Sequence, residues 1–245
     1  MKLSAVVLTH NSGAVLGDCL QSLRFADEII MVDSGSTDNT LALASAARIY
    51  KRKLVSFADQ RNFGLQQAKY PWVLMIDSDE RVPDKLAKEI KEAISTDSYS
   101  AYRVKRLNYF FGRAMKHGGY WPDWQTRLFR VSDFQKYTGA VHETPHFAGS
   151  LGSLSSHLIH YSHNNLRECL EKSVVWTKKE ALEFIKAGHP PVTWWRIIKV
   201  MVWEFCYRYF QKMAFLDGYI GLVESLIQAM NRFYVYQQVW EMQQQ

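Results

Sequence analysis

Two aspartates, Asp77 and Asp79, follow directly on an apolar run and are separated by one serine. An Asp-x-Asp pair at the end of a buried strand can hold a hard divalent cation, Mg²⁺ or Mn²⁺, that bridges to the phosphates of a substrate. The alternative is a solvated turn in which Asp79 or Glu80 caps the next helix. Carboxylates are costly to bury unless a positive charge lies between them, so this acidic run requires a cationic partner.

Three predicted strands end in polar residues. The apolar runs 3–9, 28–33 and 72–77 are typical of strands buried on both faces of a parallel sheet. The polar residues that follow these runs are Thr9, His10 and Asn11; Asp33 and Ser34; and Asp77, Ser78 and Asp79. Ligands of open α/β sheets bind outside the carboxyl ends of the strands, so these residues predict a binding site at that edge.

Helical patterns alternate with these strands up to about residue 95. They predict helices over 14–25, 41–49, 57–69 and 81–95, which indicates a doubly wound sheet. The segments after residue 99 alternate like strands, and the chain reads as helical from 165 onward. We therefore predict a mixed, mainly parallel α/β fold in two domains, 1–165 and 166–245, of which the second is a helical extension.

Charge and cysteine content narrow the class of protein. The net charge is +6, and residues 101–212 hold 17 Lys and Arg against 8 Asp and Glu. A basic, aromatic region favours a phosphate-bearing partner, although the chain has no GxGxxG, P-loop or zinc-finger pattern that would favour nucleic acid. Three widely spaced cysteines indicate a reducing compartment, and the first residues do not resemble a signal peptide.

The polar segments occur in an order that resembles the family 2 glycosyltransferases, which have the GT-A fold. The resemblance is carried by VVLTHN at 6–11, VDSGSTDNT at 32–40, QRNFG at 60–64 and MIDSDE at 75–80. The later segments WPDWQTRLFR at 121–130 and GAVHETP at 139–145 are similar to the lipopolysaccharide inner-core β-1,4-glucosyltransferases. The resemblance implies a UDP-hexose donor, a metal-dependent transfer and a glycolipid acceptor, a lipopolysaccharide core precursor.

The resemblance also implies roles for individual residues. Thr9, Asn11, Asp33, Arg61 and the DSD segment would contact the nucleotide sugar. In that segment Asp77 would lie near the ribose or a metal-bound water, Ser78 between the two acids, and Asp79 on the metal. The alternatives are that Asp33 is a loop residue that caps the next helix and that Arg61 lies on the surface of a helix.

Transfer to a sugar hydroxyl benefits from a carboxylate base, because such hydroxyls are very weak acids. Glu143 matches the position where the subgroup has its base, and Asp123 in WPDW, between two tryptophans, is the second candidate. An ion pair of Glu143 with Arg127 or Arg130 is the structural alternative.

His160, in a histidine-rich stretch, is the candidate for a further metal ligand, and imidazole suits Mn²⁺ better than Mg²⁺.

An amphipathic helix predicted over 194–212 carries charges that argue against a bilayer-spanning segment. It fits the interface of a membrane, whereas packing within the protein or in a dimer is the alternative. The resemblance implies an inverting hexosyltransferase that moves a hexose, expected to be glucose from UDP-glucose, to a heptose of the lipopolysaccharide inner core. Its expected location is the cytoplasm, or the periphery of the cytoplasmic face of the inner membrane. Two alternatives are a transferase for another glycan and a nucleotide-sugar-binding scaffold without turnover.

Overall fold

The structure is a computed structural model that describes residues 1–139 and 143–244. By its internal contacts the chain forms two compact units. Unit 1 comprises Met1–Arg106 and Asp123–His160, and unit 2 comprises Leu107–Pro122 and Tyr161–Gln245. The segment 107–122, assigned from the sequence to the first domain, thus belongs to unit 2. The division into functional domains at 165 stays a prediction.

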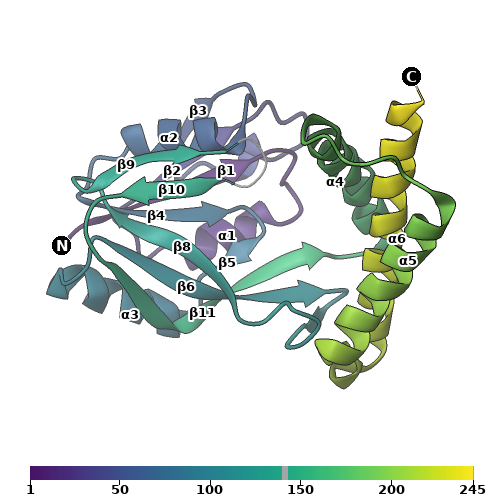
Figure 1. Cartoon of the computed structure of the whole chain (residues 1–245). Helices are drawn as coiled ribbons and strands as arrows, with labels where there is room; N and C mark the ends of the chain where they lie inside the picture. Colours follow the sequence, from purple (N-terminus) through teal and green to yellow (C-terminus); the bar gives the residue numbers. More distant parts are fainter. Residues whose placement is uncertain (140–142, 245) are drawn as a thin grey trace. The chain divides into compact units, whose positions relative to one another are not determined.

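Strands and helices alternate in the first hundred residues, as the apolar runs predict (Figure 1). The strands of this part are β1 (Leu3–Thr9), β2 (Glu28–Asp33), β3 (Arg48–Lys51), β4 (Trp72–Asp77) and β5 (Glu80–Arg81). The helices are α1 (Leu16–Ser22), α2 (Phe57–Gln66) and α3 (Asp84–Thr96), with one 3-10 turn at Leu41–Leu43.

The remaining strands follow α3, and the later helices close the chain. The strands are β6 (Ala101–Phe110), β7 (Arg113–Ala114), β8 (Asp123–Arg130), β9 (Phe134–Thr138), β10 (Thr144–Phe147) and β11 (Leu151–His163). The helical elements are α4 (Leu166–Lys186), α5 (Trp194–Cys206), a π-helical turn (Tyr207–Gln211), a 3-10 turn (Ala214–Asp217) and α6 (Gly218–Gln243). Both the predicted strands after residue 99 and the predicted helices after 165 are confirmed.

The main sheet has the strand order β3-β2-β1-β4-β8-β6-β11-β5, with β7 paired to β6. The pairs among β3, β2, β1 and β4 are parallel, whereas β8 pairs antiparallel with β4 and β6. Strands β9 and β10 form a separate antiparallel hairpin. The predicted mixed α/β fold is confirmed.

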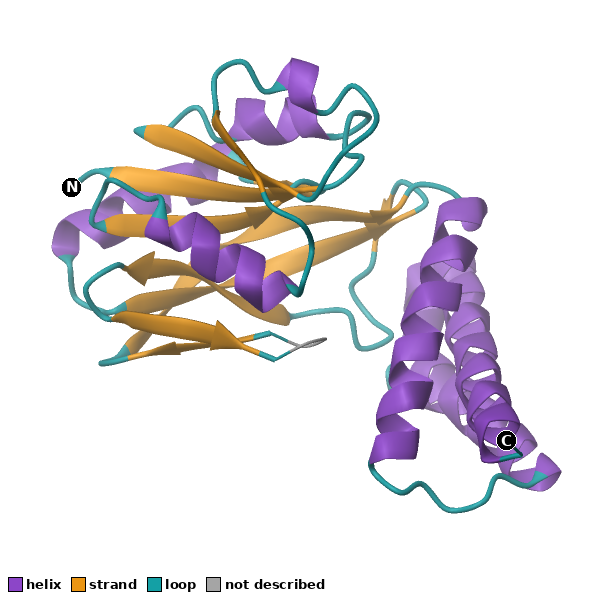
Figure 2. Cartoon of the chain, turned by 90° about the horizontal axis from the view of Figure 1, so that it is seen from above, coloured by secondary structure: helices purple, strands orange, loops and turns teal. Residues whose placement is uncertain are grey.

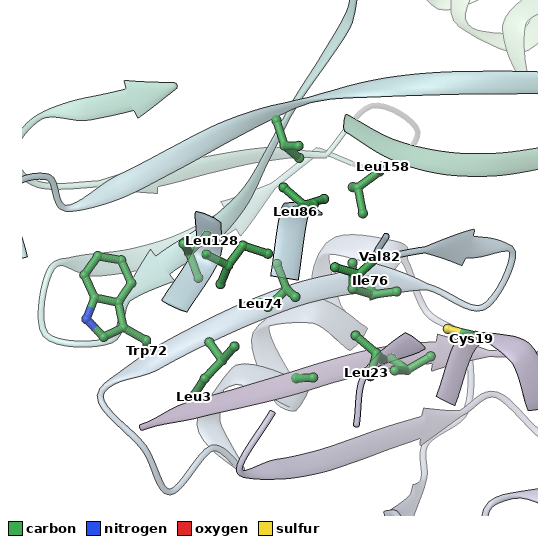
Figure 3. Packing of buried hydrophobic residues seen from close by; sticks show 14 of the residues in the cluster. Leu3, Cys19, Leu23, Trp72, Leu74, Ile76, Val82, Leu86, Leu128 and Leu158 are labelled. Atoms are coloured by element: carbon green, nitrogen blue, oxygen red, sulfur yellow. The ribbon is translucent and has the colours of Figure 1, made fainter. Parts of the chain in front are cut away.

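Each face of the unit 1 sheet is covered by its own apolar cluster. On one face, side chains of α1 and α3, such as Cys19 and Leu86, pack in one cluster with Leu3, Leu74 and Ile76 (Figure 3). On the other face, α2 and Tyr137 of β9 pack on alternate residues of the same strands, including Val6 and Met75. Successive side chains of a strand point to opposite faces, so burial on both sides explains the uninterrupted apolar runs.

The helix predicted over 41–49 is wrong. Only Leu41–Leu43 forms a 3-10 turn, and β3 begins at Arg48. Residues Arg48 to Lys51 pair in parallel register with Ile30 to Asp33 of β2. The backbone hydrogen bonds of this edge strand override the weak helical preference of an alanine-rich segment.

In unit 2, α6 packs against both α4 and α5, and the three helices lie side by side in Figures 1 and 2. The cluster between them includes Ala181 of α4, Val235 and Val239 of α6, and the half-buried Ile197 of α5. None of the helices that the structure describes combines the length and the apolar character needed to span a membrane.

Candidate functional site

The three polar strand ends meet through hydrogen bonds at one edge of the sheet. Thr9 Oγ1 at the end of β1 donates to Asp33 Oδ1 at the end of β2 over 3.2 Å. Ser12, just after β1, shares a hydrogen bond of 2.8 Å with Ser78 after β4. Parallel strands place their carboxyl ends at one edge of the sheet, which explains why residues 66 positions apart come into contact.

Asp33 organises its own loop. Its carboxylate accepts hydrogen bonds from the backbone N–H groups of Gly35 and Ser36, each at 2.9 Å, and from the hydroxyls of Ser36 and Thr9. Burial raises its pKa, but these bonds, those from Ser36 first, outweigh that effect and leave the pKa lowered. Asp33 is fully buried and binds its own loop, whereas the next helical turn, Leu41–Leu43, has no side-chain cap, so the helix-capping alternative is wrong. A contact of Asp33 with the nucleotide stays a prediction.

Asn11 joins the β1 end to the same loop. Its backbone adopts a positive φ of 48°, a conformation that asparagine tolerates better than most residues. Its Oδ1 accepts from the N–H of Thr37 at 2.8 Å, while its own N–H donates to Ser36 Oγ at 2.9 Å. Thr9 and Asn11 therefore shape the loop after β2, and their predicted contacts with a nucleotide stay predictions.

Two arginines hold Asp77. Arg61 of α2 donates to Asp77 Oδ1 at 2.8 Å, and Arg127 of β8 donates to Asp77 Oδ2 at 2.6 Å. Both arginines are buried, so Arg61 is not the surface helix residue of the alternative interpretation. Each oxygen of Asp77 thus accepts a hydrogen bond from a different guanidinium. The acidic run therefore has positive partners within the protein, and a role of Asp77 as a metal ligand stays a prediction.

Glu80 completes this network. It is fully buried, receives a hydrogen bond of 2.6 Å from Arg127 Nη2, and accepts the N–H of Asp77 at 3.0 Å. The following helix begins only at Asp84 and has no side-chain cap. Glu80 therefore serves its neighbours in the turn and does not cap α3.

Arg61 also connects Asp77 to Glu143. Its Nε donates to Glu143 Oε1 at 2.9 Å, while Nη2 holds Asp77. The sequence suggests Arg127 or Arg130 as an alternative ion-pair partner of Glu143. The observed partner is Arg61, which is 82 positions away in the sequence. One buried guanidinium thus brings the candidate base next to the acidic end of β4.

Asp123 lies at the start of β8 and is engaged in a different ion pair. Arg106 of β6 contacts Asp123 Oδ2 at 2.8 Å, and the Gln125 amide donates to Asp123 Oδ1 at 2.7 Å. The same Arg106 reaches Glu80 at 3.4 Å. Both base candidates are therefore tied by arginines to the acidic turn after β4.

Asp79 and His160 come together, although they are far apart in the sequence. His160 is paired with Glu80 in the register of β11 with β5, and its Nε2 lies 3.4 Å from Asp79 Oδ2. The described residues contain no group of three or more potential ligands that could hold a metal ion unaided. One carboxylate and one imidazole nevertheless suit a cation such as Mn²⁺ that takes its other ligands from water and a diphosphate.

Arg127 is the buried site residue whose role the sequence does not predict. From the sequence, Arg127 is a candidate ion-pair partner of Glu143, but it lies inside the protein and pairs with Asp77 and Glu80. A usable signal is its place directly before Leu128 and Phe129, both of which are buried. A guanidinium in such a strand requires a buried carboxylate as its partner.

The ion pairs of Asp77 predict a dependence of stability on acid. Burial, the largest influence, raises its pKa, but Arg127 and Arg61 together hold it well below the usual range. An unfolded aspartate titrates near pH 4, so this stabilisation is present above about pH 4 and is lost as the pH falls toward the folded pKa. We expect urea unfolding of Asp77→Asn to show a weaker loss of stability between about pH 4 and pH 2 than wild type. Equal slopes for both proteins would contradict the assignment.

A doubly wound sheet whose parallel strands end in these polar loops is the architecture of the GT-A glycosyltransferases. Residues 4–158 match the model of glycosyl transferase family 2, so the chain belongs to that family and is a glycosyltransferase.

Similar proteins are described as glycosyltransferases. An uncharacterized glycosyltransferase of Rickettsia bellii is 29% identical over 250 residues, covering 95% of this chain and 84% of the relative. The lipopolysaccharide core biosynthesis glycosyltransferase LpsC of Rhizobium meliloti is 28% identical over 248 residues, covering 95% and 90%. Among solved structures, that of TarS 1–349 from S. aureus is similar with 15% identity and a TM-score of 0.49, covering 100% of this chain and 92% of TarS 1–349.

Proposed function

We propose that the chain is an inverting, metal-dependent hexosyltransferase that moves glucose from UDP-glucose to a heptose hydroxyl of the lipopolysaccharide inner core. The observation that carries the proposal is the Arg61 bridge, which joins Glu143 to the acidic end of β4. The relationship to LpsC, described as a lipopolysaccharide core biosynthesis glycosyltransferase, supports the class of acceptor. A UDP-hexose donor and a core precursor as acceptor are most consistent with a reaction on the cytoplasmic side of the inner membrane.

In this proposal the polar strand ends bind the donor. Thr9, Asn11, the Asp33 loop and Ser78 form the surface on which the nucleotide would rest. Asp79 and His160 would hold a divalent cation, Mg²⁺ or Mn²⁺, which neutralises charge on the diphosphate. Asp77 acts through Arg61 and Arg127, which it keeps in position.

Glu143 would act as the base in a single displacement. Its carboxylate accepts the proton of the acceptor hydroxyl as the hydroxyl oxygen forms a bond to the anomeric carbon. The bond from that carbon to the diphosphate breaks on the opposite side, and its electron pair leaves with the diphosphate. Attack opposite the leaving group converts an α-linked donor into a β-linked product. The Nε of Arg61 fixes the direction of the Glu143 carboxylate.

Product analysis tests the proposal directly. The purified chain is incubated with UDP-glucose and a heptose-terminated core acceptor, in Mn²⁺, in Mg²⁺ or with EDTA. We expect a β-glucosylated product and release of UDP in either metal and neither with EDTA. An α-linked product would refute inversion. UDP-glucose binding with no transfer to any acceptor would favour the scaffold alternative, and transfer only to a different glycan would change the acceptor.

Replacing Asp79 tests the cation site. Asp79→Asn keeps the size of the side chain but removes its charge, and we expect turnover to fall about 10²-fold through loss of metal-assisted catalysis. UDP binding, measured by calorimetry, should weaken in Mn²⁺ but stay unchanged in EDTA. The matched control is Asp18→Asn, at a carboxylate that is 84% exposed. Equal UDP affinity of Asp79→Asn and wild type in Mn²⁺ would exclude Asp79 as a ligand.

A further inference from the structure

Helix α5 turns its apolar side outward. Residues four apart lie on one face of a helix, and Trp194, Ile198 and Val202 form one exposed row of this kind. The adjacent row consists of Trp195, Lys199 and Trp203, which are exposed as well. Trp194 is 75% exposed and Trp203 is 65% exposed, which is unusual for the largest apolar side chain.

The opposite side of α5 meets the rest of unit 2. Ile197 packs into the cluster between α4 and α6, and Glu204 forms a salt bridge of 2.5 Å with Arg208. The helix therefore uses its mixed side for packing and leaves its most apolar side to the exterior. An amphipathic helix that only completes a core has the reverse orientation.

The apolar surface continues beyond α5. The turns that follow, and the start of α6, expose further large apolar side chains: Phe210, Met213, Phe215, Leu216 and Tyr219. A run of exposed tryptophan, phenylalanine and leucine of this extent marks an interaction site, because soluble surfaces carry such residues singly. We call the exposed apolar residues between Trp194 and Tyr219 the α5 face.

Charge and residue type identify the partner. The charged residues exposed within this range are both lysines, Lys199 and Lys212. Tryptophan and tyrosine beside lysines are suited to the boundary between lipid headgroups and acyl chains, where lysine stems lie along apolar surface and the ammonium groups reach the phosphates. The 13 residues of α5 span roughly 20 Å, less than the hydrocarbon core of a bilayer. The helix therefore suits a position in the membrane surface.

We propose that the α5 face binds the surface of an anionic lipid bilayer. This inference goes beyond the transfer reaction and does not depend on it, because lipid binding needs neither donor, metal nor acceptor. Apolar burial supplies one part of the affinity, and attraction of Lys199 and Lys212 to anionic headgroups supplies the other.

Co-sedimentation of the full chain with vesicles tests this proposal without any substrate. We expect the protein to pellet with vesicles of phosphatidylcholine and phosphatidylglycerol, with a shift of tryptophan emission to shorter wavelength, and to bind pure phosphatidylcholine less. The double variant Trp194→Ser/Trp203→Ser should bind the mixed vesicles at least about tenfold more weakly, since burying one large apolar side chain changes affinity by about that factor. The matched control, Trp240→Ser, removes an exposed tryptophan of α6 outside the α5 face and should bind like wild type.

Circular dichroism establishes that the variants are folded. If the double tryptophan variant does not fold, Lys199→Glu/Lys212→Glu provides the second test, and it should abolish the preference for phosphatidylglycerol. Wild-type protein that stays in the supernatant, or variants that bind as well as wild type, would overturn the proposal. A dimer in light scattering that the tryptophan substitutions convert to a monomer would assign the α5 face to a second copy of the chain.

Discussion

Replacement of Glu143 by glutamine is expected to lower kcat for glucosyl transfer by about 10²-fold or more, the usual contribution of a general base. Glutamine has nearly the same shape, and its carbonyl oxygen can still accept the hydrogen bond from Arg61 Nε. The variant therefore removes the ability to take a proton while it preserves the local contact. Steady-state kinetics with UDP-glucose and the core acceptor measure this effect, and KM for the donor should change little.

Two further variants serve as a control and as a test of the second base candidate. Glu171→Gln, at an exposed position of α4, is the matched control and should retain wild-type kcat. Asp123→Asn tests the second base candidate, which is held by Arg106. A full loss of transfer in Asp123→Asn, together with wild-type turnover in Glu143→Gln, would move the base from Glu143 to Asp123.

Replacement of Arg127 by methionine is expected to lower the free energy of unfolding by about 3–5 kcal/mol, the cost of breaking a buried ion pair from one side. Methionine fills part of the volume but leaves Glu80, which is fully buried, and Asp77 without their shared guanidinium. Urea denaturation at neutral pH, followed by circular dichroism, measures the change.

The neighbouring Arg130→Met is the matched control for this prediction. Arg130 forms ion pairs with Asp97 and Asp133 in which all three side chains stay partly exposed, so its replacement should cost less than that of the buried Arg127. In the double variant Arg127→Met/Glu80→Gln, part of the loss should be recovered, because the uncompensated charge of Glu80 is gone. Equal destabilisation by the two single arginine substitutions would show that the network of Arg127 has no special importance.

The two aspartates of the DSD segment have different partners. Its first aspartate holds two arginines, and through Arg61 it is linked to the candidate base. Its second aspartate lies beside His160. The two carboxylates thus have separate surroundings: Asp77 lies between two arginines, and Asp79, beside His160, is the one that we propose for the cation.

Sequence patterns alone predict the central strands and the polar edge of the sheet, because apolar runs and the polar residues that follow them are local features of the chain. Continuous apolar runs marked β1, β2 and β4, and the polar residues after them marked the edge where Thr9 meets Asp33 and Ser12 meets Ser78. The rule that parallel strands share a carboxyl edge was enough to join residues that are far apart in the chain. Asp79 and His160 were also selected from sequence, and they lie 3.4 Å apart.

Tertiary structure alone decided the charge partners, the edge strand and the orientation of α5. Arg61 contacts Glu143 across 82 positions, and Arg127 contacts Asp77 across 50, so no local pattern encodes either pair. The segment that begins β3 became a strand because β2 offered it backbone hydrogen bonds. Periodicity predicts that α5 has an apolar face, but only packing against α6 determines that this face points outward. Local sequence determines which side chains share a face or an edge, whereas burial and charge pairing depend on the segments that meet there in the folded chain.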